Sequence, residues 1–439
     1  MTVLAHGIGT RGDLPLPTWM FAYGAGAVVV LSFVALGALW RTSRLDGKAP
    51  GRPLPPAAER IVRSLEWPVR VIVLVVFALT LGAALFGPLG PEATIAPVTV
   101  YVVFWVGVQF ASMVLGDVWA VVSPWDTLVA LAERLGWRPP PRPRLPRPSR
   151  TAAGLWALAA IVAFAWMELV HPQPADTRLL GVLVLGHTVA AVGGGLLWGR
   201  SWLRQAEGFT VLFSYLGAMG IFHQRADGRL GVRPPFSGLA SVPMHPTAMA
   251  LILALLGSTT FDGLTRTELY RDLIGARTGW EAVPLATALF AAVLAAVGFA
   301  YVLAMGIAAA VVRDRTADVA LRFAHSLVPI AFAYSVAHYF SLLVFEGQGF
   351  PSRLSDPLGQ GWDLFGTAGD AIDYRVLSTT TIAWIQVAAI VIGHVVGVVL
   401  AHDRAVARYD AVTAARSQYA LLAIMVGYTV LALVLLLEA

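Results

Sequence analysis

Long apolar stretches separated by short polar segments dominate the chain. About 20 apolar helical residues are needed to cross the ~30 Å hydrocarbon core of a bilayer. Ten stretches approach or exceed that length, and they cover residues 21–39, 69–87, 97–115, 152–170, 179–198, 243–261, 283–312, 323–345, 379–401 and 417–437. The pattern predicts an all-α, polytopic integral membrane bundle of about ten transmembrane helices.

An eleventh apolar stretch, from Phe209 to Phe222, has 14 residues and contains Gly217 and Gly220. It is too short to span a bilayer. We therefore expect a short re-entrant or interfacial helix here, in addition to the ten spans.

The composition supports a membrane protein and excludes other classes. Hydrophobic residues make up 57% of the 439 residues and charged residues 13%, which is about half the charged share of a soluble domain. Charged residues are too few to cover the surfaces of soluble domains, and the hydrophobic fraction is too high for a disordered chain. The chain has no cysteine, which excludes disulfides, thiolate metal sites, iron–sulfur clusters and cysteine nucleophiles.

The basic residues predict the orientation of the bundle. Loops 40–68, 116–151, 199–242, 313–322 and 402–416 carry 23 Lys and Arg, and the alternate segments and the termini carry 7. Cytoplasmic loops are enriched in such residues, so both termini should lie outside a multi-pass protein of the cell membrane. The net charge of +5 then reflects these loops, and no nucleic-acid partner is expected.

Thirteen acids lie in the outer segments. They serve either orientation and solubility or a vestibule that attracts cations.

A proline- and arginine-rich segment, 138–150, divides the chain. Its composition predicts a stiff, extended linker. We expect a three-helix membrane segment over 1–115, a cytoplasmic amphipathic segment with this linker over 116–151, and a seven-helix membrane domain over 152–439. The chain shows no internal repeat of the inverted kind found in many transporters.

Ionisable residues within spans are costly and are functional candidates by default. At 1.5 Å per residue, His338 lies about 24 Å above Arg322, and Gln386 about 27 Å above Arg404. These two residues should therefore be nearly level on consecutive, contacting helices, with His394 within one or two turns. His187 lies in the middle of the fifth span.

Carboxylates near span ends extend this set. Glu346 follows His338 by eight residues and shares its helical face, Glu168 and His171 have an i, i+3 spacing used in helix-borne metal sites, and Asp262 ends the sixth span. Each has a simpler alternative, because buried histidines often bond to backbone carbonyls and Asp-Gly is common in caps and turns. The candidate metal ligands are His338, His394, Glu346, His187, Asp262, Glu168 and His171, with Gln386, His325 and His402 as supporting polar residues.

Several motifs resemble a family of actinobacterial polytopic membrane proteins labelled fenitrothion hydrolase. They are Leu4–Gly9 with Asp13–Pro15, Ser258–Gly263, the stretch from His325 through His338 to Gly347, and Gly393–His394 with Ala401–Asp403. The resemblance covers the whole chain. It implies hydrolysis of an organophosphate triester, and we carry over no catalytic residue from it.

The sequence thus leaves three functions open. The first is a membrane hydrolase of small apolar phosphotriesters, in which a divalent metal held by histidines and carboxylates activates a water; zinc is the first choice, and copper, manganese or iron are alternatives. The second is a transporter or channel for metal ions or protons. The third is a non-catalytic membrane subunit of a complex. Besides the lipid bilayer and this substrate, the residues predict no partner, and they leave the oligomeric state open.

Overall fold

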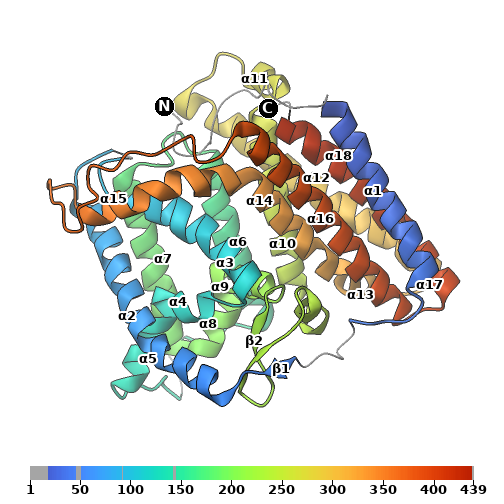
Figure 1. The fold of residues 1–439 in the computed structure, drawn as a ribbon, viewed down its shortest axis with the longest axis horizontal. Coiled ribbons are helices and arrows are strands. Elements are labelled where there is room, and N and C mark those ends of the chain that lie inside the picture. Colours follow the sequence, from blue (N-terminus) through green and yellow to red (C-terminus); the bar gives the residue numbers. More distant parts are fainter. Residues whose placement is uncertain (1–17, 46–50, 91, 142–144, 438–439) are drawn as a thin grey trace.

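A computed structural model describes residues 18–45, 51–90, 92–141 and 145–437 (Figure 1). The motif at Leu4–Gly9 and Asp13–Pro15 lies outside these residues. Ten helical segments in the described ranges are long and apolar enough to cross a membrane, which confirms the predicted all-α polytopic bundle. They are α1 (Thr18–Leu39), α2 (Pro56–Phe86), η1 with α3 (Val98–Gly107, Val108–Leu115), α6 (Arg150–Leu169), α7 (Thr177–Trp198), α10 (Pro246–Thr265), α12 (Val283–Val312), α14 (Leu327–Phe345), α16 (Thr379–Val406) and α18 (Tyr419–Leu437).

Two spans differ from the simple apolar stretches that predicted them. α2 begins thirteen residues before residue 69, with Pro56 at its first position, where the missing N–H of proline costs no helical bond. The third span begins as the π-helix η1 and continues as α3. Hydropathy does not distinguish a π-helix from an α-helix, so the sequence analysis could not find it.

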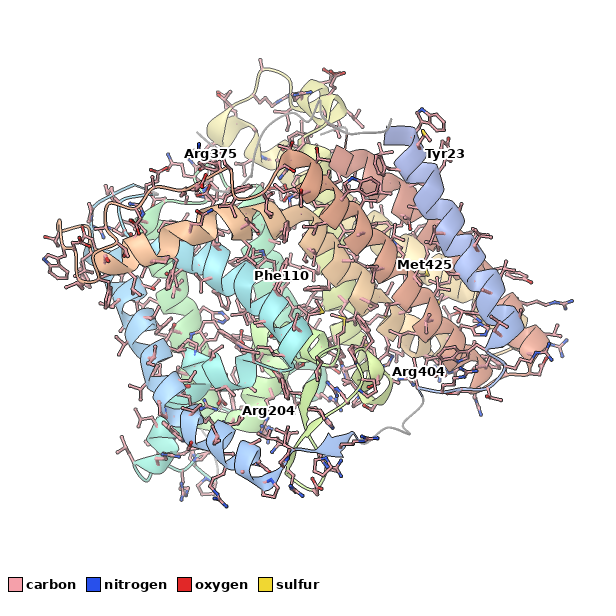
Figure 2. All side chains as sticks on the ribbon, viewed as in Figure 1. Tyr23, Phe110, Arg204, Arg375, Arg404 and Met425 are labelled. Carbon is pink, nitrogen blue, oxygen red and sulfur yellow. The ribbon has the colours of Figure 1, made fainter. Side chains whose placement is uncertain are left out.

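Short elements lie at the two ends of the bundle. α11 (Glu268–Ile274) and α15 (Gly349–Ser355) lie at one end, and α5 (Pro124–Arg134) and the small sheet lie at the other (Figure 1). Arg375 is likewise far from Arg204 and Arg404 (Figure 2). The segments predicted to share a side of the membrane therefore do so. Which side is cytoplasmic stays a prediction, and residues 1–17 and 438–439 at the termini are not described.

The described residues include one small sheet outside the spans. Its three strands are β1 (Arg52–Pro53), β3 (Leu230–Val232) and β2 (Phe222–Gln224), all antiparallel, in the order β1-β3-β2. It joins the segment before α2 to the segment between α9 and α10. The predicted all-α class did not include it.

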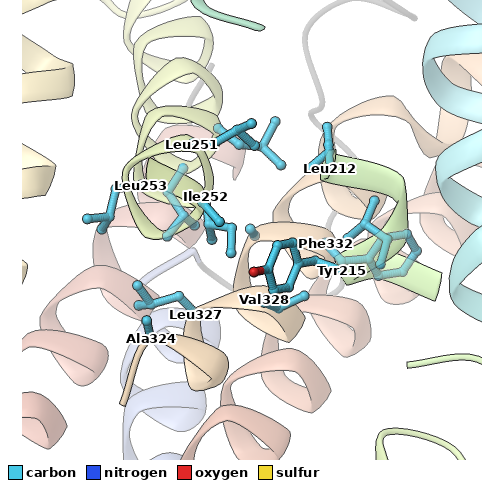
Figure 3. Close-up of a cluster of buried hydrophobic side chains, with 14 of the residues drawn as sticks. Leu212, Tyr215, Leu251, Ile252, Leu253, Ala324, Leu327, Val328 and Phe332 are labelled. Atoms are coloured by element: carbon cyan, nitrogen blue, oxygen red, sulfur yellow. The ribbon is translucent and has the colours of Figure 1, made fainter. Parts of the chain in front are cut away.

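The short apolar segment forms α9 (Gly208–Gly217), which is buried inside the bundle. It begins beside His187, at the middle of α7, and ends against Gly116 and Asp117, just after α3. Its Leu212 and Tyr215 lie in a cluster with α10 and α14 (Figure 3). Together with α8 (Arg200–Ala206) it enters the bundle and returns, which fits the re-entrant alternative.

The helices pack in an order that differs from their order in the chain. α1 packs against α16 and α18, whereas α2 packs against α7. The helices of 1–115 are thus distributed over the bundle.

α14 and α16 approach each other closely. A Cβ at Gly393 would overlap that of Ala333, and one at Gly397 would lie 2.8 Å from the carbonyl O of Ser326. Small residues four apart allow such contacts.

Thiol labelling can test the orientation, because the chain has no cysteine. In intact cells, an impermeant thiol reagent should modify Gly361→Cys, in the loop before α16, and should not modify Arg144→Cys, in the predicted cytoplasmic linker. The predicted cytoplasmic loops carry 23 Lys and Arg, and the outer segments and termini carry 7. The expectation follows because cytoplasmic loops are enriched in these residues. Permeabilised cells, in which both positions should react, are the control. Labelling of position 144 in intact cells would contradict the orientation.

Candidate functional site

Three spanning helices bring five polar side chains together, and we call this group the charged cluster. Asp262 of α10 contacts Nε2 of His338 of α14, a pair that is ionic when the histidine is protonated. Nη2 of Arg266 lies 3.2 Å from Nε2 of the same histidine. On α14, Tyr339 donates a hydrogen bond of 3.2 Å to Glu168 of α6. The sequence predicted Glu168, Asp262 and His338 as site residues, but neither Arg266 nor Tyr339.

The charged cluster is almost closed to solvent and lipid. The side chains of Asp262 and His338 are 1% and 6% exposed, and Glu168 is also buried. Glu168 and Asp262 interact electrostatically, so the two carboxyl groups share the positive charge of Arg266 and, when protonated, of His338. Asp262 does not cap α10, because the helix continues to Thr265. The simpler reading of Asp262 as a helix cap was therefore wrong.

Gln386 and His394 lie on the helix beside the charged cluster. Nε2 of Gln386 donates to the carbonyl O of Ala337 at 2.5 Å, which confirms that α14 and α16 touch at the level of His338. His394 is fully buried, and its Nδ1 lies 2.8 Å from the carbonyl O of Ile390 in its own helix. This is the backbone-bonded alternative that the sequence left open.

The other predicted residues lie apart from the charged cluster. Glu346 accepts from Tyr374 at 3.2 Å, His171 accepts from the backbone N of Gln173 at 3.2 Å, and Nε2 of His325 lies 2.5 Å from the carbonyl O of Val242. Among the described residues, no group of three or more histidines and acids is placed to hold a metal ion. The residues present do not fit the predicted metal centre, so the metal and the choice of zinc stay predictions and no step below uses them.

The pair His402–Asp403 has a structural role. Nε2 of His402 lies 3.0 Å from the carbonyl O of Trp40. Asp403 accepts from Nε1 of Trp40 at 2.9 Å, from Ser43 at 2.8 Å and from the backbone N of Arg44 at 2.6 Å. One buried carboxylate thus fixes the segment after α1 to the end of α16.

A second pair of ionisable groups lies where α9 meets α7. Nε2 of His187 lies 3.1 Å from Oε1 of Glu207. Glu207 also accepts from the backbone N of Phe209 at 2.9 Å, and from the N and the hydroxyl of Thr210 at 2.7 and 2.6 Å. We call His187 and Glu207 the dyad. The sequence analysis included position 207 in the loop 199–242 and did not single out Glu207; its position just before the short apolar stretch was the signal for a buried carboxylate.

Several donors surround the carboxyl group of Glu207. They are His187, the backbone N–H groups of Phe209 and Thr210, and the hydroxyl of Thr210, and donors of this kind favour the ionised form of a carboxyl group. A neutral His187 that donates from Nε2 to this carboxylate has its lone pair on Nδ1. The dyad can thus set the tautomer of His187.

An apolar cavity of about 1270 Å³ lies against the dyad. It is lined by α2, η1, α3, α6, α7 and the end of α14, with the re-entrant α9 at its wall. His187 lines it, and its ring meets Trp125 edge-on with the centroids 4.5 Å apart. The lining also includes Val76, Phe104, Gly107, Trp119, Met167 and Phe209.

The cavity reaches both the lipid-facing surface and one end of the bundle. Ile72 and Leu183 line it and are 62% and 44% exposed, although both lie within spanning helices. Apolar molecules dissolved in the bilayer therefore meet its wall directly. His171 and Gln348 give it a polar end, on the side of the bundle where α15 lies.

Comparison with protein-family models, curated proteins and solved structures gives no match to this chain. Over the described residues, the fold is that of a polytopic membrane protein with ten candidate spans. The charged cluster, the dyad and the cavity are the features that bear on its function.

Proposed function

We propose that this protein is an integral membrane hydrolase of small apolar esters, with organophosphate triesters as the substrate class and His187 as the general base. One observation carries the proposal, namely a histidine oriented by a buried carboxylate at the wall of a large apolar cavity. Ligand sites of this kind are mostly apolar with a few placed polar groups. The resemblance to fenitrothion hydrolases suggests the phosphotriester class.

The dyad supplies a base and the group that orients it. Nδ1 of His187 takes a proton from a water, and the ionised Glu207 stabilises the imidazolium that forms. The water oxygen bonds to phosphorus as the bond from phosphorus to the aryl oxygen breaks. The phenolate leaves with that electron pair and then takes the proton from Nδ1. A general base of this kind contributes about 10²–10⁴-fold to a rate.

The cavity accounts for how substrate and water would meet. His187 is ten residues from the start of α7 and eleven from its end, so it lies about 15 Å from either end. A phospholipid keeps its ester bonds near the headgroups, far from this depth. A small triester without a headgroup dissolves in the hydrocarbon and reaches it past Ile72 and Leu183. Water would come from the polar end at His171 and Gln348.

The test is release of nitrophenol from a nitrophenyl phosphotriester by the purified protein in detergent. Ala163 lines the cavity on α6, and Ala163→Phe should lower kcat/KM by roughly 10–100-fold because a misplaced substrate loses its alignment with the base. Ala159→Phe is the matched control, since Ala159 is also exposed on α6, one turn away, and does not line the cavity. A wild type without hydrolysis, or equal rates in both variants, would contradict the proposal.

The charged cluster favours a second candidate, transport coupled to protons or ions. Paired ionisable residues within spans mark such pathways in many membrane proteins. Uptake into proteoliposomes driven by a proton gradient would support this candidate, and hydrolysis without uptake would support the first. The third alternative, a non-catalytic subunit, requires copurifying partners.

A further inference from the structure

The wall of the apolar cavity changes in character towards the dyad. Four aromatic side chains line it there, namely Phe104, Trp119, Trp125 and Phe209, and we call them the aromatic end. Their neighbouring ring centroids lie 4.7 to 6.2 Å apart, which is the spacing of favourable aromatic pairs. The ring of His187 belongs to the same part of the wall, with its centroid 4.5 Å from that of Trp125 and 5.7 Å from that of Phe209.

Hydrogen bonds fix the two indole rings of the aromatic end. Nε1 of Trp125 donates to Thr188 at 3.0 Å, and Nε1 of Trp119 donates to Thr210 at 3.2 Å. Each threonine lies beside a member of the dyad, through the sequence in one case and through a hydrogen bond to the carboxylate in the other. Because both N–H groups have partners, neither indole needs a hydrogen bond from a molecule in the cavity. The aromatic end is therefore preorganised and presents carbon surface.

The part of the wall nearer the lipid is aliphatic. Its residues on α2 and α7 include Ile72, Val76, Leu183 and Val184. Aliphatic side chains favour burial of any apolar group, whereas aromatic rings gain further energy from a second ring in edge-to-face or offset geometry. A ligand with one aromatic ring and short alkyl groups therefore matches both parts of the cavity.

We propose that the aromatic end is an aryl-binding site, in which a neutral aromatic ring packs against Trp125 and Phe209 beside His187. Alkyl groups of the same ligand lie in the aliphatic part of the cavity. In the reaction proposed above, the bound ring is the phenolate leaving group. That last assignment rests on the proposed function, whereas binding of the ring does not.

The charges around the aromatic end favour a neutral ring over a cation. Aromatic rings also bind cations, and Glu207 is close by. No acidic residue in the described part of the chain lines the cavity, however, and the oxygens of Glu207 already accept from His187, Phe209 and Thr210. A cation that entered from the bilayer would lose its hydration without gaining a carboxylate partner.

The first measurement compares two probes that cannot be hydrolysed, para-fluoroanisole and its saturated cyclohexyl counterpart. Their binding to the full-length protein in a neutral detergent is followed by ¹⁹F NMR, with partition into empty micelles subtracted. The aromatic probe should bind about 3–10-fold more tightly, because a ring gains aromatic pairing in addition to burial. Equal binding of the two probes, or tighter binding of the saturated one, would overturn the proposal.

Variants test the place of binding. Phe209→Leu removes a ring whose side chain makes no hydrogen bond, and it should reduce the aryl preference about twofold or more; Trp125→Leu should do the same. Phe110→Leu is the matched control, because Phe110 packs on Phe332 with the centroids 5.5 Å apart and does not line the cavity. An unchanged preference in both Phe209→Leu and Trp125→Leu would place the ring elsewhere and overturn the assignment.

A charged probe tests the choice of a neutral ring. Phenyltrimethylammonium and its neutral counterpart tert-butylbenzene are compared by their displacement of para-fluoroanisole. The neutral compound should displace the probe at the lower concentration. Tighter binding of the cation would show a cation site and contradict the proposal.

Inhibition of hydrolysis separates this proposal from the proposed function. If the aryl group is the leaving group, para-fluoroanisole should inhibit nitrophenol release competitively, with an inhibition constant equal to its Kd. Aryl preference in a protein that hydrolyses no phosphotriester would support the aryl site and contradict the proposed function. Hydrolysis that saturating para-fluoroanisole does not inhibit would contradict the aryl site as the position of the leaving group.

Discussion

Replacing His187 with alanine should lower kcat for nitrophenyl phosphotriester hydrolysis by about 10²–10⁴-fold. The variant keeps the apolar cavity, so KM should change much less than kcat. The physical reason is that Nδ1 of His187 is the proposed proton acceptor, and Glu207 orients the ring through the 3.1 Å contact at Nε2. Stopped and continuous assays of nitrophenol absorbance at saturating substrate measure kcat directly.

Two variants serve as controls for this prediction. Glu207→Gln keeps an oxygen that accepts from Nε2 but removes the charge that stabilises the imidazolium, so its kcat should fall between those of the wild type and His187→Ala. His245→Ala changes a histidine that lies at the start of α10 and does not line the cavity, and it should retain the rate. If His187→Ala is as active as the wild type, His187 is not the base.

Replacing Asp126 with alanine should destabilise the protein by about 1–3 kcal/mol, the usual cost of leaving a buried donor without one of its partners. Asp126 of α5 joins two arginines. It lies 3.2 Å from Nη1 of Arg70 on α2, and it accepts from Nε and Nη2 of Arg200 on α8 at 2.8 and 2.6 Å. Arg70 is 4% exposed. Without Asp126 it keeps an ion pair of 3.1 Å with Glu66, so the loss should be smaller than for a buried charge that has no partner left.

Denaturant unfolding in detergent, followed by tryptophan fluorescence, measures this loss. Glu268→Ala is the control, because Glu268 is almost fully exposed and its nearest cation is 3.9 Å away; it should unfold like the wild type. A stability of Asp126→Ala equal to that of the control would show that Glu66, Thr127 and the carbonyl of Ala120 are sufficient partners for Arg70.

The ten spans could be predicted because a bilayer imposes length and apolar character on every helix that crosses it. Arg70 shows what this rule leaves out. It lies near the start of the apolar stretch 69–87, and its partner Asp126 and the second arginine on that carboxylate, Arg200, lie 56 and 130 residues later. Hydropathy contains no information about which of these segments meet.

For the candidate site, the sequence predicted only the relative depths of residues within the spans. His338 and Gln386 are level on touching helices, as the count of residues from the span ends indicated. Depth does not indicate how a helix is rotated about its own axis, or which helices distant in the sequence pack against each other. His187 therefore pairs with Glu207 of the re-entrant segment, and Glu346 with Tyr374 of a loop. Carboxylates in segments classed as loops were the main omission, as Glu207 and Asp403 show.

The packing of α1 has a consequence for synthesis. Its neighbours are α16 and α18, and the carboxylate that fixes Arg44 belongs to a residue 359 positions later. At roughly 5–20 residues per second, the ribosome takes about 20–70 s to reach that residue. During this time α1 is in the membrane without the helices against which it packs. A chain that stops before Thr379 would never supply them, and its α1 would be open to capture by other membrane helices or by quality-control proteases.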